Sequence, residues 1–150
     1  MSAAIRRSEA AELNDAWAIV TEYYEAIGVV EREGPEAFAA NYFGEGTGIW
    51  LARIGDEVAG CIALRRLDDG SAEVKRLYVR PAWQGRRVAH LLLDALHEFA
   101  RDARYRWLYL DSKDDLAVAI RFYRSRGYED CPRYNDNPQA TVFLRRSVQP

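Results

Sequence analysis

Residues 72–93 of the chain, AEVKRLYVRPAWQGRRVAHLLL, decide the fold that the sequence predicts. The first part of this stretch, up to Val79, is rich in residues that favour β-strands, and Pro81 ends the strand because proline has no N–H for a sheet ladder. A short turn containing Gly85 follows. Apolar residues then recur at helical spacing, at Val88, Leu92, Leu96 and Phe99. The stretch therefore predicts a strand, a loop and a helix.

The loop between this strand and helix has the features of an anion site. The first N–H groups of a helix have no partner within the helix, and the helix dipole favours negative charge there. Gly85 lets the backbone approach a ligand closely, while Gln84, Arg86 and Arg87 add donors and charge. We therefore expect a phosphate group to bind where the helix begins.

Further strands are predicted on both sides of this stretch. Residues 49–79 read as three consecutive strands, with turn residues at 55–56 and 68–71, which is an antiparallel meander. The helix leads to another short strand at 107–110, and a connection through a helix indicates a parallel neighbour. Residues 128–134 and 141–145 predict a closing pair of strands. The expected fold class is α/β (α+β), with a mixed, mostly antiparallel sheet flanked by helices.

The N-terminal part predicts a short strand and two helices. Residues 4–7 form the expected strand, and Ser8 is the expected N-cap of the first helix. The second helix is expected to begin at Pro35, with Phe38 and Tyr42 facing inward.

Composition limits the possible classes of protein. A chain of 150 residues with 49% hydrophobic content predicts a single domain over residues 1–150. The formal net charge of −2 argues against a nucleic-acid binder, which usually needs a strongly cationic face. No apolar run approaches the ~20 residues of a membrane span, so we expect a soluble, cytoplasmic protein.

The cysteines and histidines do not predict a metal site. Cys61 and Cys131 lack paired spacing, which indicates two reduced thiols rather than zinc ligands or a disulfide framework. His90 and His97 are seven residues apart on the predicted helix, without cysteine or carboxylate partners, so packing or surface roles are expected.

Residues 79–89, VRPAWQGRRVA, resemble the acetyl-CoA signature of the GNAT superfamily of N-acetyltransferases. That signature is Gln or Arg, two free positions, Gly, one free position, then Gly or Ala. Gln84 and Ala89 fit it, whereas Arg87 stands where glycine is usual. The backbone N–H remains at Arg87, and its side chain could pair with a phosphate.

A second signature follows in the order that the superfamily predicts. Ala119, Phe122-Tyr123 and Gly127-Tyr128 match an alanine, an aromatic-tyrosine pair and a glycine-aromatic ending, in a helix that is expected to end at Gly127. Leu116 falls where many relatives have a cofactor-contacting asparagine. The resemblance implies acetyl-CoA as co-substrate, no metal, and cofactor contacts from these residues: Leu77, Tyr78, Val79, Gln84, Gly85, Arg86, Arg87, Val88, Ala89 and Phe122.

The resemblance also implies two candidate catalytic side chains. Glu73 lies on the central strand, six residues before Val79, where the histone-acetyltransferase branch has its catalytic glutamate. It would take the proton of the acceptor amine directly or through an ordered water, and the sequence leaves both open. Glu73 also fits a solvent-facing glutamate paired with Arg76 or another arginine.

The resemblance implies that Tyr123 protonates the leaving thiolate, and packing with a hydrogen-bonded hydroxyl is the alternative. The oxyanion would be met by a backbone N–H near Leu77 to Val79, where a break in strand pairing would expose donors.

The acceptor stays open, as a small-molecule or peptide amine. Aromatic residues gather in the first third of the chain: Tyr23, Tyr24, Tyr42, Phe43 and Trp50. They fit core packing, or, as in the superfamily, an acceptor pocket. Homodimers are common in the superfamily, so a homodimer is possible. A non-catalytic acyl-CoA-binding or sensing module on the same fold is the alternative function. A nucleic-acid-interacting protein that uses the arginine clusters is a third, less favoured one.

Overall fold

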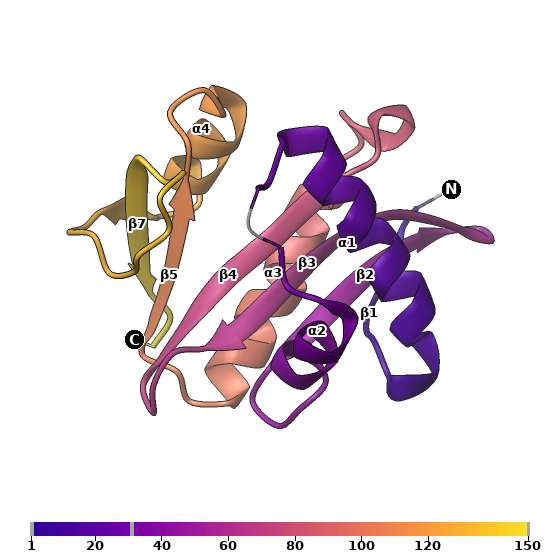
Figure 1. The fold of residues 1–150 in the computed structure, drawn as a ribbon, viewed down its shortest axis with the longest axis horizontal. Coiled ribbons are helices and arrows are strands. Elements are labelled where there is room, and N and C mark those ends of the chain that lie inside the picture. Colours follow the sequence, from indigo (N-terminus) through magenta and orange to yellow (C-terminus); the bar gives the residue numbers. More distant parts are fainter. Residues whose placement is uncertain (1, 31, 150) are drawn as a thin grey trace.

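The structure is a computed structural model, and it describes residues 2–30 and 32–149. The helices and strands follow one another from β1 to β7, and Figure 1 shows their arrangement. In chain order they are β1 (Ala4–Arg7), a 3-10 turn (Ala10–Glu12), α1 (Leu13–Ile27), α2 (Pro35–Tyr42), β2 (Gly48–Ile54), β3 (Glu57–Arg66), β4 (Ser71–Val79), a second 3-10 turn (Pro81–Trp83), α3 (Val88–Asp102), β5 (Trp107–Ser112), α4 (Ala117–Ser125), β6 (Glu129–Asp130) and β7 (Val142–Ser147).

The strands form one sheet in the order β1-β2-β3-β4-β5-β7-β6. Every neighbouring pair is antiparallel except β4 and β5, which are parallel. The predicted meander is therefore confirmed as β2, β3 and β4. The predicted parallel neighbour is confirmed as β5, which follows the helix α3 and lies beside the meander's last strand.

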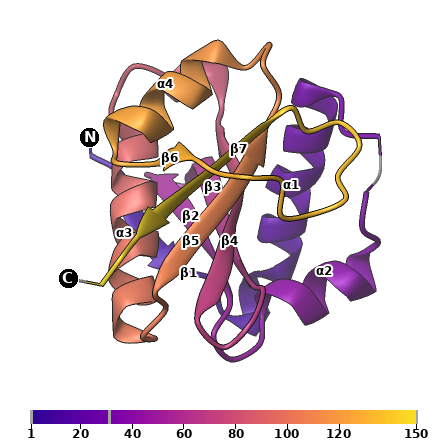
Figure 2. The ribbon, with the colours of Figure 1, turned by 90° about the vertical axis from the view of Figure 1, so that its left-hand side faces the viewer.

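Helices cover both faces of the sheet, as Figure 2 shows, with α1 and α2 on one side and α3 and α4 on the other. Two apolar clusters correspond to the two faces. The cluster under α1 and α2 includes Ile19, Phe38 and Tyr42. The cluster under α3 and α4 includes Leu92, Leu96 and Tyr123. None of the helices within residues 2–30 and 32–149 has the length and apolar content that a membrane span needs.

The expected cap at Ser8 is wrong. The backbone N–H of Ser8 donates to the carbonyl of Ile49 at 2.8 Å, which continues the pairing of β1 with β2. A 3-10 turn then precedes α1, and it caps itself through Glu9, whose N–H donates to Glu12 Oε1 at 3.1 Å. Ser8 therefore follows β1 directly and is hydrogen-bonded to β2, at a position where the sequence pattern suggests the start of a helix.

The first strand of the C-terminal pair, β6, is shorter than the expected strand over residues 128–134. Only Glu129 and Asp130 pair with β7 as a strand, and the N–H of Cys131 makes one further bond, to the carbonyl of Phe143 at 2.9 Å. Pro132 has no N–H to continue the ladder, so the chain leaves the sheet there. The α4 helix ends at Ser125, and Gly127 two residues later has the left-handed φ of 91° that suits a helix C-terminus.

His97 is a core residue of α3. It is 2% exposed, and its Nε2 lies 2.8 Å from the Tyr128 hydroxyl. The guanidinium of Arg146 donates to His97 Nδ1 at 3.1 Å, so that nitrogen carries no proton. Burial, together with Arg146, lowers the pKa of His97 from 6.5 to about 4.

This pKa predicts a pH dependence of stability. The unfolded chain protonates His97 near pH 6.5, whereas the folded chain does so only near pH 4. The stabilisation is therefore complete above about pH 6.5 and is lost as the pH falls toward 4. Between pH 7 and pH 5, urea unfolding should show the wild type losing about 2 kcal/mol more than His97→Gln. Equal losses in the two proteins would contradict the assignment.

Candidate active site

The candidate site lies where β4 and β5 separate. The two strands pair only from Ser71 with Trp107 to Glu73 with Tyr109. Beyond Glu73, no described residue of β4 has a partner on β5, and Figure 1 shows the two strands diverging. A cavity of about 530 Å³ follows this separation. Its walls come from β3, β4, β5, the end of α1, the helix α4 and the segment that contains Asn135, Asp136, Asn137, Gln139 and Ala140.

A β-bulge interrupts β4 beside this cavity. Lys75 pairs with Ala63 and Tyr78 with Cys61, so β4 has one more residue than β3 between these pairs. Arg76 has a left-handed φ of 60° at this point. The break in pairing thus covers Arg76 and Leu77, earlier than the expected Leu77 to Val79, because Tyr78 and Val79 are paired with Cys61 and Gly60. Because of the extra residue, Leu77 packs against the α3 side of the sheet and Tyr78 against the α1 side.

The side chain of Arg76 joins the bulge to the segment between α1 and α2. Its guanidinium pairs with Glu33 at 3.3 Å and lies 5.0 Å from the ring centre of Tyr24. Glu33 also accepts a hydrogen bond from Asn41 Nδ2 at 2.7 Å. Both charged side chains are mostly buried, so this ion pair fixes the segment over the cavity.

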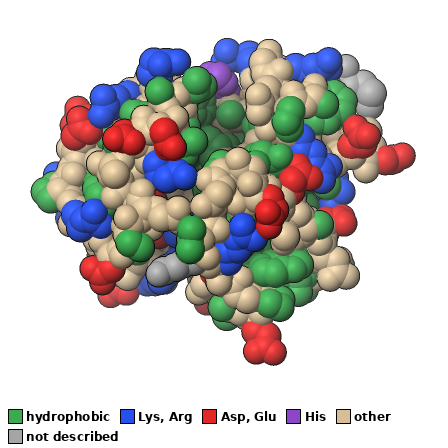
Figure 3. All heavy atoms as spheres, turned by 45° about the horizontal axis from the view of Figure 1, so that its top comes forward, with side chains coloured by type: hydrophobic (Ala, Val, Ile, Leu, Met, Phe, Trp, Pro, Cys, Tyr) green, Lys and Arg blue, Asp and Glu red, His purple; other side chains and the backbone are tan. Residues whose placement is uncertain are grey.

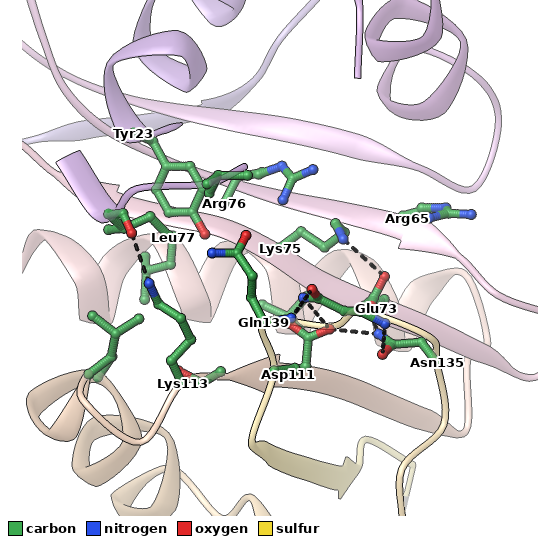
Figure 4. A pocket seen from close by; sticks show the side chains of 18 of the residues that line it. Tyr23, Arg65, Glu73, Lys75, Arg76, Leu77, Asp111, Lys113, Asn135 and Gln139 are labelled. Atoms are coloured by element: carbon green, nitrogen blue, oxygen red, sulfur yellow. Dashed lines mark hydrogen bonds and ion pairs between the residues drawn. The ribbon is translucent and has the colours of Figure 1, made fainter. Parts of the chain in front are cut away.

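Two contacts across the cavity fasten the end of α1 to the far wall. The ammonium of Lys113 donates to the carbonyl of Ile27 at 2.9 Å. The amide of Gln139 donates to the carbonyl of Gly28 at 3.2 Å and accepts from the N–H of Val30 at 3.0 Å. Figure 4 shows Lys113 and Gln139 reaching from the β5 side toward this end of α1.

Glu73 is buried in the cavity wall, only 2% exposed, rather than facing solvent. Its Oε2 accepts hydrogen bonds from the Tyr134 hydroxyl at 2.6 Å and from Asn135 Nδ2 at 3.1 Å. Its Oε1 lies 3.5 Å from the ammonium of Lys75. Arg76, an alternative partner, pairs with Glu33 instead. Burial, and next the charge of Glu73, raise the pKa of Tyr134, which therefore remains a hydrogen-bond donor.

Asn135 connects Glu73 to a second carboxylate. Its Nδ2 also donates to Asp111 Oδ2 at 2.6 Å, and Asp111 accepts a further bond from Asn137 at 3.3 Å. These residues were not among the sequence candidates. The run Asn135-Asp136-Asn137-Pro138 indicated a turn, but no pattern in the sequence indicated where that turn would pack.

Tyr123 lines the same cavity from α4. Its side chain is 7% exposed, and its hydroxyl has no hydrogen-bond partner among the described residues. Burial raises the pKa of Tyr123 well above 10, so the phenol stays protonated at neutral pH. The structure thus brings Glu73 and Leu77 of β4 and the distant Tyr123 of α4 to one cavity.

The remaining predicted site residues lie outside this cavity. Tyr78 donates from its hydroxyl to Glu22 Oε2 at 2.8 Å, and Val79 pairs with Gly60. Phe122 packs against the ring of His90, with 4.9 Å between ring centres. Of the aromatic residues, Tyr23 lines the cavity, while Tyr24, Tyr42 and Trp50 are core residues at 4% exposure or less.

The loop from Gln84 to Ala89 leads into α3 with two left-handed residues. Gly85 has a φ of 80°, and Arg87, the N-cap of α3, has a φ of 62°. A left-handed backbone favours glycine, which gives a physical reason why glycine suits the position of Arg87. The first intrahelical bond joins the N–H of Leu91 to the carbonyl of Arg87, so three earlier N–H groups have no intrahelical acceptor. They belong to Val88, Ala89 and His90.

Cationic and apolar side chains meet at this end of the molecule. Figure 3 shows hydrophobic side chains within a hollow and Lys and Arg side chains near it. Arg86 stacks over the ring of Trp83, with 5.0 Å to the ring centre. Among the described residues, no group of three or more His, Cys, Asp or Glu side chains is placed to hold a metal ion.

The left-handed φ of Arg76 predicts that the glycine variant at this position is more stable than the alanine variant. Arg76→Ala keeps the left-handed strain and leaves Glu33 without its cation, so it should lower the free energy of unfolding by about 3 kcal/mol. Arg76→Gly also loses the ion pair but removes the strain, and should be about 1 kcal/mol more stable than Arg76→Ala. Urea unfolding measures both. Equal stability of the two variants would show that Arg76 carries no left-handed strain.

Comparison with known proteins agrees with this geometry. The model of the acetyltransferase (GNAT) family matches residues 13–128. An uncharacterized N-acetyltransferase of Schizosaccharomyces pombe is 30% identical over 142 residues, which cover 90% of this chain and 87% of that protein.

Solved structures share the whole fold. An acetyltransferase of the GNAT family from Staphylococcus aureus has a TM-score of 0.85 at 18% identity, covering 99% of this chain and 100% of that one. The PaiA N-acetyltransferase from Thermoplasma acidophilum, in complex with coenzyme A, has a TM-score of 0.73 at 15% identity, covering 98% and 99%. The family match spans most of this chain, both sequence signatures included, and the protein belongs to the GNAT family of acetyltransferases.

Proposed function

We propose that the protein transfers an acetyl group from acetyl-CoA to a primary amine, by direct attack in a ternary complex. The observation that carries this proposal is the cavity between β4 and β5, which brings Glu73 and Tyr123 together beside an unpaired strand edge. The fold likeness to an N-acetyltransferase solved with coenzyme A supports the choice of co-substrate.

The cofactor would bind along the edge of β4 and at the start of α3. Residues 74–79 have no partner on β5, so their backbone can pair with the pantetheine amides as a neighbouring strand would. The free N–H groups of Val88, Ala89 and His90 suit the pyrophosphate. Gln84 contributes to the loop itself, because its Nε2 donates to the carbonyl of Val79 at 3.0 Å.

The reaction needs a neutral amine, and Glu73 produces it by accepting the proton of the acceptor's ammonium group. An alkylamine with a pKa of ~10.4 is mostly protonated near neutral pH, so Glu73, or a water that it holds, takes the proton. Tyr134 and Asn135 both bind Oε2, which orients the carboxylate and leaves Oε1 toward Lys75. The amine nitrogen then bonds to the thioester carbon.

Backbone and phenol groups complete the reaction. A backbone N–H of β4 around Leu77 to Val79, at or just after the bulge, stabilises the oxyanion. When the carbon–sulfur bond breaks, Tyr123 gives its proton to the thiolate and regains one from the attacking nitrogen. The products are an N-acetylated amine and coenzyme A, and the first proton of the ammonium is left on Glu73 or its water.

Two measurements test the proposal. Isothermal titration calorimetry should show one acetyl-CoA bound per chain, and thiol release should accelerate with at least one member of a panel of primary amines. Acetyl-CoA binding without thiol release would favour the non-catalytic module. Absence of acyl-CoA binding would overturn the proposed function.

Tyr123→Phe should lower turnover at saturating acetyl-CoA by about 100-fold, because the leaving thiolate loses its proton donor. The Kd for acetyl-CoA should change by less than about threefold. Tyr105→Phe is a matched control, since that hydroxyl donates to the Gly46 carbonyl away from the cavity. Unchanged turnover in Tyr123→Phe would show that this tyrosine is not the acid.

Arg87→Gly tests whether the backbone or the side chain of Arg87 holds the phosphate. The backbone N–H and the left-handed turn persist with glycine, so the Kd for acetyl-CoA should rise by less than about threefold. Calorimetry with acetyl-CoA measures this directly. A rise of about tenfold or more would assign a phosphate contact to the guanidinium.

A further inference from the structure

Two cations lie together at the Glu73 end of the cavity. Arg65 on β3 pairs across the sheet with Glu73, and Lys75 follows Glu73 by two residues on the same face. Arg65 and Lys75 are therefore diagonal neighbours, and both line the cavity. Figure 4 shows Lys75 beside Glu73 and Arg65 farther along the sheet, with its guanidinium extending away from Glu73, whereas Lys113 lies at the opposite end, near Leu77.

Lys75 is the ion-pair partner of Glu73, whereas Arg65 is left without a carboxylate partner among the described residues. Oε2 of Glu73 is already held by Tyr134 and Asn135, and the ammonium of Lys75 lies at 3.5 Å from Oε1. Arg65 has no carboxylate within ion-pair distance among the described residues, although it stands opposite Glu73. Its chain neighbour Arg66, by contrast, pairs with Asp69 at 2.9 Å.

The phosphates of the cofactor are out of reach of this pair. A strand rises ~3.3 Å per residue, and the β3 partners of Lys75 and Val79 are three residues apart, so Lys75 lies ~10 Å along the sheet from Val79. The loop to α3 follows only after Val79. The proposed pyrophosphate site is at the start of α3. An anion at Arg65 and Lys75 must therefore come from the acceptor.

We propose that Arg65 and Lys75 bind a carboxylate of the acceptor, so that the acceptor is an amino acid or a similar molecule with its amine and carboxylate a few bonds apart. This inference rests on the proposed function, since it places the amine at Glu73. The carboxylate pairs with the guanidinium and the ammonium, and the neighbouring amine faces the Glu73 carboxylate. A diamine or polyamine would instead place a second ammonium against two cations.

Matched acceptors test the carboxylate. L-amino acids and β-alanine are compared with their own amides in acetyl-CoA thiol-release assays, so that each pair has the same skeleton and the amide lacks the carboxylate charge. The amide's amine loses its proton more readily, so a preference for the acid cannot come from the amine. The wild type should favour acids over amides by about 30-fold in kcat/KM.

Three variants assign the preference to residues. Arg65→Gln and Lys75→Gln should each reduce the preference to within about threefold, mainly through KM for the acid. Arg66→Gln is the control and should keep the wild-type preference, because this arginine pairs with Asp69. Calorimetry confirms in every variant that acetyl-CoA still binds.

The outcomes separate this inference from the proposed function. Amides or diamines used as well as the acids would overturn the carboxylate site while leaving acetyl-CoA and the reaction in place. Acetyl-CoA binding without acetylation of any acid in the panel would overturn it as well. Failure of the wild type to bind acetyl-CoA would remove the proposed function first.

Discussion

The separation of β4 from β5 after Glu73 is the constraint on which the site depends. A parallel pair that continued to Val79 would satisfy its backbone groups within the sheet and leave no cavity. Because pairing stops at Glu73 and Tyr109, the remaining edge of β4 keeps donors and acceptors for a ligand that resembles a strand. The bulge at Arg76 adds a local change of direction to this edge.

Contacts on both faces of the sheet surround the place where the two strands separate. The cluster under α3 and α4 includes Leu108 from β5 and Val74 from β4, so the sheet is continuous below the separation. Across it, Lys113 and Gln139 bind the backbone at the end of α1, and Arg76 binds Glu33 in the following segment. The cavity is thus enclosed by long-range contacts, which also bring charged groups of both signs to its walls.

Much of the fold could be predicted because apolar residues recur along the sequence with the periods of strands and helices. The meander, the loop before α3 and the helical spacing of Leu92 and Leu96 all follow from local patterns. Local patterns failed at Ser8, where a backbone bond to Ile49 keeps the residue in the sheet. The expected strand over residues 128–134 also overlooked Pro132, which ends β6 early for the same reason that Pro81 ends β4.

The site was predictable only where a local motif carries the chemistry. Glu73 and Tyr123 could be named from the strand and the second signature, and the structure places both on one cavity, while their catalytic roles stay predictions. The contacts of Tyr134 and Asn135 with Glu73 join residues more than 60 positions apart, and no spacing in the sequence encodes them. The left-handed backbone of Arg76 could not be predicted either, because glycine is the residue that usually indicates a positive φ in a sequence.

The most direct measurement is hydrogen–deuterium exchange of the backbone amides with and without acetyl-CoA. Binding along the edge of β4 predicts slower exchange at residues 74–79 and at Val88, Ala89 and His90, with little change in β1 and β2. Unchanged exchange at both places in the presence of saturating acetyl-CoA would contradict a cofactor site between β4 and β5.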